Sequence, residues 1–122
     1  MTDYSKMSDF EINKAVAIKL GLKPYYDDGK YSHDGEFVVT RGPKCLGRWE
    51  PCKEPHQAWS IIVENKISLN AHGLHAWMAW KNTGSTLEEI SSNRHQHSAI
   101  WDNPLRAAMI VFLMIKEPEN DS

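Results

Sequence analysis

Glycines, cations and a tryptophan alternate in one irregular stretch of the chain. Arg41-Gly42-Pro43-Lys44 is followed by Gly47-Arg48-Trp49. Glycine lets backbone N–H groups approach an anion, and arginine can grip a phosphate with two parallel hydrogen bonds. Trp49, Trp77 or Trp80 can stack on a nucleobase. For the motif alone, the favoured interpretation is a basic surface loop that packs one tryptophan down. A phosphate or nucleotide site is the alternative, and it gains weight if other polar residues converge on the same pocket.

Arg106 and the segment Arg94–His97 extend this candidate site. Arg106 is expected in the first turn of a helix, where the helix dipole disfavours a cation by roughly 0.3–1 kcal/mol. It therefore needs a partner, either an acid such as Asp102 or Glu64, which is the commoner arrangement, or an anionic ligand. The candidate ligand-binding residues are Arg41, Lys44, Arg48, Trp49, Trp77, Arg94, His95 and Arg106. The chain has no Walker or dinucleotide fingerprint.

Zinc-type ligands occur at Cys45, Cys52 and His56, and His33 or His95 could provide a fourth. Their spacing, C-x6-C-x3-H, misses the usual C-x2-4-C knuckle of structural zinc sites. We therefore predict two ordinary thiols, no bound metal and no cofactor.

Catalysis is not indicated by any motif in the chain. Serines, histidines and acids are plentiful, but none stands in a nucleophile motif such as G-x-S-x-G. A catalytic triad drawn without geometry carries no weight. We therefore favour a binding protein over an enzyme.

Composition bounds the class of protein. The 122 residues suit one domain, and 41% hydrophobic with 25% charged residues is ordinary for a globular chain. The net charge of −2 argues against extended nucleic acid as a partner, although a local basic patch is compatible with it. The first ten residues, MTDYSKMSDF, do not read as a secretory signal, so we expect a cytosolic protein with reduced thiols.

Three helices are predicted from local signals. Asn103 is a good N-cap and Pro104 suits the first helical position, so the apolar run up to Ile115 is the expected core helix. Ser8-Asp9-Phe10-Glu11 is a capping box for a helix that ends before Gly21. A third helix is expected from Pro55 to about Lys66.

Strands are predicted at Glu36–Thr40 and Leu74–Lys81, with a possible hairpin around Asp34-Gly35. A very short strand at Lys30–Ser32 and one or two helical turns at Ser85–Ile90 are further possibilities. The expected loops and tail are Lys23–Gly35, Arg41–Lys53, Asn70–Gly73, Ser91–Asp102 (with His95-Gln96-His97 solvated) and a short disordered tail from about residue 117. The expected fold is therefore a small α+β domain over residues 1–122, with three main helices packed on a short antiparallel sheet.

The strand around Trp77 and Trp80 carries an aromatic residue on each face. One face must be core, and the other is either covered or an exposed patch. Tryptophan, methionine and arginine are enriched at interfaces, so an exposed patch would indicate a partner protein or a homodimer.

Three blocks of the chain resemble the NinX-like family of bacteriophage proteins: DYSKMSDFEINKAVA, AWSIIVENKISL and NPLRAAMIVFLMI. They cover about a third of the chain but are spread along its length. The segments Lys23–Glu54 and Gly73–Asp102 carry no matching pattern. The resemblance brings no catalytic residues, and it implies a phage accessory protein acting in the host cytoplasm.

The combined expectation is a non-enzymatic phage accessory protein in counter-defence or host takeover that binds or sequesters a nucleotide-like anionic ligand. One alternative is direct inhibition of a host factor through a Trp-rich surface, and another is an accessory nucleic-acid binder in phage recombination. A homo-oligomer is compatible with each, and nothing suggests a membrane partner.

Overall fold

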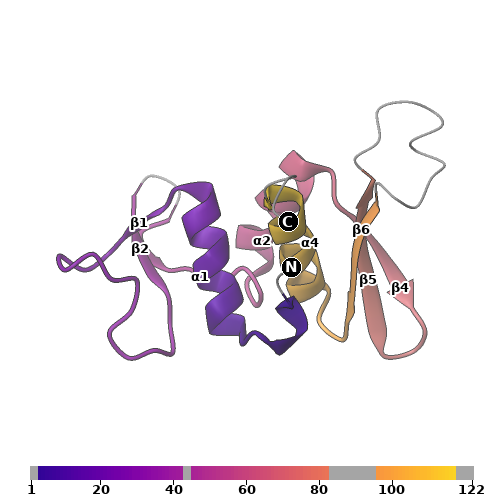
Figure 1. Cartoon of the computed structure of the whole chain (residues 1–122), viewed down its shortest axis with the longest axis horizontal. Coiled ribbons are helices and arrows are strands. Elements are labelled where there is room, and N and C mark those ends of the chain that lie inside the picture. Colours follow the sequence, from indigo (N-terminus) through magenta and orange to yellow (C-terminus); the bar gives the residue numbers. More distant parts are fainter. Residues whose placement is uncertain (1–2, 43–44, 83–95, 118–122) are drawn as a thin grey trace.

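The computed structural model describes residues 3–42, 45–82 and 96–117. Its helices are η1 (Tyr4–Lys6, a 3-10 helix), α1 (Asp9–Leu20), α2 (Pro55–Asn65) and α4 (Pro104–Lys116), which are labelled or traced in Figure 1. All three predicted α-helices are confirmed. Capping side chains begin α1 and α4, and Pro55 marks the first turn of α2. Ser8 and Glu11 form the predicted capping box, and Gly21 ends α1 in the left-handed conformation at φ 75°.

Helix α4 is the centre of the molecule, as its apolar sequence predicts. Figure 1 shows α1 and α2 on one side of it and the β4–β5–β6 sheet on the other. Every residue from Arg106 to Leu113 is buried. The side chain of Asn103 accepts hydrogen bonds from the N–H groups of Leu105 and Arg106, so the predicted N-cap is confirmed.

One small antiparallel sheet lies beyond α1 (Figure 1). It consists of β1 (Lys23–Pro24), β2 (Val39–Arg41) and β3 (Gly47–Arg48), in that spatial order. Lys23 pairs with Arg41 and Val39 pairs with Arg48. The predicted loops therefore contribute two short strands.

The predicted strand Glu36–Thr40 is shorter and shifted in the structure. The carboxylate of Asp34 accepts hydrogen bonds from the N–H groups of Glu36 and Phe37, at 2.8 and 3.1 Å, which holds this segment in a turn. These hydrogen bonds, first that of Glu36, lower the pKa of Asp34 to about 2. The described backbone at Lys30–Ser32 is not a strand, although Tyr31 accepts a hydrogen bond from the N–H of Val39.

The second antiparallel sheet has β5 (Ala76–Asn82) in the middle, between β4 (Ser68–His72) and β6 (Gln96–Trp101). Ala79 pairs with Leu69 and Ala99, on the face that packs against α4. The described part of the chain thus holds two three-stranded sheets where a single sheet was predicted.

Two segments predicted as loops are strands. Ser68–His72 was expected to lead into a turn, and Gln96–Trp101 was expected within a solvated loop. Both have mixed polar composition because only alternate residues face the core, and β5 supplies their hydrogen bonds. The expected helical turns at Ser85–Ile90 lie outside the described residues, as do residues 118–122 of the tail.

The α+β class with three main helices is confirmed. In the described residues, Arg106, Asn13 and Thr40 are the buried polar or charged side chains of a core that is otherwise apolar. None of the described helices is both long and apolar enough to cross a membrane.

Candidate ligand-binding hollow

A hollow of about 440 Å³ opens between α2, the end of α1 and the segment around β3. We call it the α2 hollow. Its lining combines polar and apolar side chains: Leu20, Cys45, Leu46, Arg48, Trp49, His56, Gln57, Ser60 and Glu64. The size is within the 300–1,000 Å³ range of small-molecule sites.

Helix α2 provides one wall of the α2 hollow. His56, Ser60 and Glu64 recur every four residues, so they share one face of the helix. Pro55 occupies the first turn, and the N-cap residue Glu54 makes no side-chain hydrogen bond to the helix. The Glu54 carboxylate instead lies 3.7 Å from Nδ1 of His56. The hollow therefore meets the positive end of an α-helix that no side chain caps.

Gln57 ties the opposite wall to α2. Its Oε1 accepts a hydrogen bond from the N–H of Glu50 at 2.7 Å, and its Nε2 donates to the carbonyl of Arg48 at 3.0 Å. The same amide group lies 3.6 Å from Sγ of Cys45. This one side chain thus holds the irregular segment after β2 against the first turn of α2.

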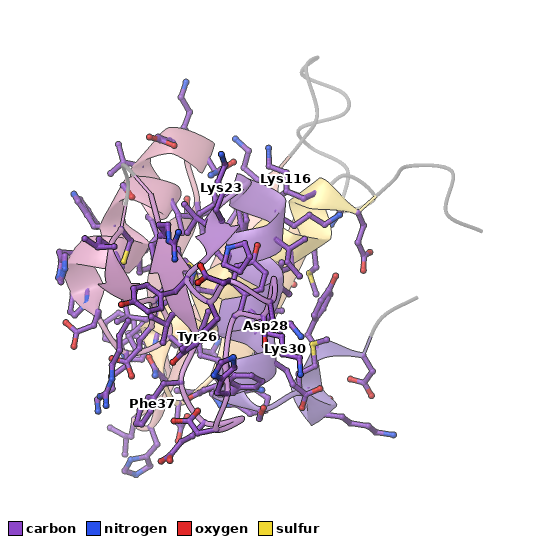
Figure 2. All side chains as sticks on the ribbon, turned by 90° about the vertical axis from the view of Figure 1, so that its left-hand side faces the viewer. Lys23, Tyr26, Asp28, Lys30, Phe37 and Lys116 are labelled. Carbon is purple, nitrogen blue, oxygen red and sulfur yellow. The ribbon has the colours of Figure 1, made fainter. Side chains whose placement is uncertain are left out.

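Among the described cations of the predicted set, Arg48 is the one that lines the α2 hollow. Its guanidinium carbon lies 3.7 Å from the centroid of the Phe37 ring, so the side chain is propped on an aromatic surface. Figure 2 views this end of the molecule and shows Phe37 below Tyr26 on the same face. The side chain of Arg48 is exposed and can exchange water for an anion.

Trp49 forms part of the floor and is only 4% exposed. The backbone N–H of Trp49 donates to the carbonyl of Val38 at 2.9 Å, and this hydrogen bond extends the β2–β3 pairing. The indole Nε1 is buried and has no hydrogen-bond partner among the described residues. The alternative reading of the loop, in which it packs a tryptophan down, matches this position, and a buried Trp49 is not a stacking platform.

Arg41 is on β2 but outside the α2 hollow. Its guanidinium donates to the carbonyl of Tyr25, lies 3.4 Å from Asp27 and lies 5.5 Å from the Tyr25 ring. Lys23 and Lys30 are on this side of the molecule too, together with Asp28 (Figure 2). Basic and acidic side chains are thus both present on this side of the molecule.

Trp77 is on β5, on the opposite side of the helices from β2 (Figure 1), and is 39% exposed. Lys44, Arg94 and His95 lie outside the described residues. The single convergence that the sequence suggested is therefore not present among Arg41, Arg48 and Trp77. Trp77 belongs to the other sheet, and Arg41, although it is in the same sheet as Arg48, contacts Tyr25 and Asp27 instead of the hollow.

Arg106 is buried and has protein partners. Its guanidinium lies 2.6 Å from the carboxylate of Asp9, donates to the carbonyl groups of Tyr4 and Met7, and stacks 4.4 Å from the Trp101 ring. The expected acidic partner exists, but it is Asp9 and not Asp102 or Glu64. Arg106 does not line the α2 hollow.

The zinc-type residues do not come together. In the described part of the chain, no three histidine, cysteine or acidic residues are grouped to hold a metal ion. Cys52 is fully buried, and burial raises the pKa of its thiol to about 12. Cys45 is half-buried, with its thiol 3.3 Å from the carbonyl of Arg48.

The sequence pointed to Arg48 and Trp49 of this hollow but missed Gln57, Ser60 and Glu64. His56 was considered only as a metal ligand. The available signal was the four-residue spacing of polar side chains on α2, which is also the ordinary pattern of a solvated helix face. Only the position of this helix face, opposite β3, distinguishes a wall of the hollow from an ordinary solvated face.

A family model described as "Bacteriophage P22, NinX" matches residues 3–116, which include every described helix and strand. Neither a curated protein nor a solved structure matches the chain.

Proposed function

The chain belongs to the family of bacteriophage P22 NinX and is therefore a phage accessory protein; we propose that it acts without catalysis, by binding a small nucleotide-like anion in the α2 hollow. The observation that carries this proposal is the placing of Arg48 beside the uncapped N-terminus of α2, at the wall of a hollow of small-molecule size. Sequestration of such a ligand in the host cytoplasm would serve counter-defence or host takeover.

The charges at this end of the α2 hollow suit a phosphate. Arginine presents several N–H donors in a plane and binds phosphate oxygens in pairs. The first turn of a helix adds a partial positive charge. In α2 this charge is the main contribution, because Pro55 has no N–H group and the N–H groups of Gln57 and Ala58 donate to the carbonyl of Glu54. Gln57 joins these two elements, since its amide bonds the backbone carbonyl of Arg48. The backbone of Arg48 is therefore fixed at the first turn of α2, and its exposed guanidinium, which packs on Phe37, is free to adjust to a phosphate.

The test is binding of a panel of mononucleotides and cyclic dinucleotides, followed by thermal shift and titration calorimetry. A ligand that binds only the folded state must raise its stability by mass action. Absence of stabilisation by every member of the panel at millimolar concentration would refute the proposal.

Arg48→Ala is expected to weaken binding of the stabilising nucleotide at least tenfold, because a hydrogen bond to a charged group contributes about 1.5–3 kcal/mol. Arg41→Ala is the matched control, since Arg41 is an exposed arginine of the same sheet that does not line the hollow. Equal loss of affinity in both variants would show only a general charge effect and would contradict the assignment of the site.

A second candidate function rests on the outer face of the β4–β5–β6 sheet. Met78 and Ile100 pair on the face opposite Ala79, and Ile100 is 50% exposed. Trp80 shares that face and donates from Nε1 to Asn70 at 2.6 Å. Such an apolar face favours a partner protein.

A pull-down from host lysate separates the two candidate functions. A stoichiometric protein that stays bound at high salt would support the apolar sheet face, because salt screens charge pairs and leaves hydrophobic contacts in place. Recovery of no stoichiometric partner under these conditions would count against it.

A further inference from the structure

The α2 hollow has charges of opposite sign at its two ends. The backbone of Arg48 lies at the first turn of α2, where Gln57 bonds its carbonyl, and its guanidinium packs on Phe37. Glu64 lies two turns further along the same helix face. With a rise of 1.5 Å per residue, His56 and Glu64, which are eight positions apart, are separated by about 12 Å along the helix axis. The face of α2 that lines the hollow thus has about the length of a small organic ligand.

The backbone of α2 adds to this separation of charge. The N-terminus of a helix carries partial positive charge and the C-terminus partial negative charge. The charges of Arg48, near the N-terminus of α2, and of Glu64, near its C-terminus, therefore have the same signs as the partial charges of the helix ends. An anion such as free phosphate is attracted at the Arg48 end and repelled at the Glu64 end.

An ionised carboxylate accepts hydrogen bonds and donates none. The part of a ligand beside Glu64 must therefore present N–H groups or a positive charge. Ser60, midway along the face, has a hydroxyl that donates weakly to the carbonyl of Gln57 at 3.4 Å and keeps its lone pairs for a ligand hydroxyl. The order along the α2 hollow is a phosphate-binding end, a hydroxyl and an N–H-binding end.

We propose, as a refinement that rests on the proposed function, that Glu64 selects a guanine base while Arg48 holds the phosphate of the same nucleotide. Guanine presents two neighbouring donors, the N1–H and the N2 amino group, which match the two oxygens of a carboxylate. Adenine presents its amino group beside a ring acceptor, N1, which faces a carboxylate oxygen unfavourably. The carboxylate is therefore a specificity-determining group.

The experiment is titration calorimetry of the wild-type protein with guanosine monophosphate, inosine monophosphate and adenosine monophosphate. Wild type is expected to bind the guanine nucleotide about tenfold more tightly than the adenine nucleotide, with the inosine nucleotide between them, because it lacks the amino group. Glu64→Gln is expected to weaken guanine nucleotide binding about tenfold and to leave adenine nucleotide binding within twofold. Glu36→Gln, an exposed acid outside the hollow, is the matched control and is expected to change neither.

The possible outcomes distinguish failure of guanine selection by Glu64 from failure of nucleotide binding in the α2 hollow. Equal affinity for guanine and adenine nucleotides, unchanged in Glu64→Gln, would overturn the guanine selection while leaving an Arg48-dependent nucleotide site. Absence of binding by all three nucleotides in wild type would overturn the selection as well, and the broader panel with Arg48→Ala then decides whether any nucleotide site exists.

Discussion

Replacement of Arg106 by methionine is expected to lower the free energy of unfolding by about 3 kcal/mol, which is large against the 5–15 kcal/mol of a typical domain. Arg106 is 5% exposed and joins elements from both ends of the chain. Its guanidinium binds the carboxylate of Asp9 at the start of α1 and the carbonyl groups of Tyr4 and Met7.

Methionine preserves much of the side-chain volume of Arg106 but removes these polar contacts. The carbonyl groups then lose a charged donor, and each such loss costs about 1–3 kcal/mol when the acceptor stays buried. The packing of the guanidinium on Trp101, 4.4 Å from its ring, is lost as well. The expected change is thus in stability, with no direct effect on the α2 hollow.

Urea unfolding followed by tryptophan fluorescence measures this effect, since a shifted midpoint at constant slope reports stability alone. Lys116→Met is the control, as an exposed residue of the same helix, and is expected to change stability by less than about 0.5 kcal/mol. An Arg106→Met protein as stable as wild type would show that the buried cation is dispensable.

Replacement of Phe112 by alanine is expected to cost about 3–5 kcal/mol of unfolding free energy. Phe112 is 1% exposed and is among the largest fully buried side chains. It belongs to α4, against which α1, α2 and the β4–β5–β6 sheet all pack. A cavity at this position cannot be filled by movement of one element without loosening its contacts with the others.

Calorimetric melting of the Phe112→Ala and Ile18→Ala proteins tests this expectation. Ile18 is half-exposed on α1, so its truncation is expected to cost less than about 1 kcal/mol. Comparable losses in the two variants would contradict the central position of α4.

The sequence predicted the helices because their signals are local. Ser8, Asn103 and Gly21 act on backbone groups within one turn of themselves, and the structure confirms each of these caps. The strands were harder to predict. Gln96–Trp101 is a strand because it pairs with β5, and that pairing involves residues more than a dozen positions away.

The candidate site shows the same division. The chemistry of Arg48 was evident from its residue type and its neighbours. The polar face of α2 has no distinctive composition, and it becomes a wall of the hollow only because Gln57 bonds the segment around β3. Trp77 and Arg41 are separated because they belong to different sheets, and this depends on strand pairing.

Arg106 illustrates what the sequence determines and what only the tertiary structure decides. A cation in the first turn of a buried helix requires a compensating charge, and the sequence alone established that need. The partner is Asp9, 97 residues away, and any of several acids would have met the same requirement. The sequence therefore determined the helices, their caps and the chemical needs of buried groups, because these act over short distances. Only tertiary structure decided which distant residue meets each need, because packing of α1 against α4 brings Asp9 and Arg106 together.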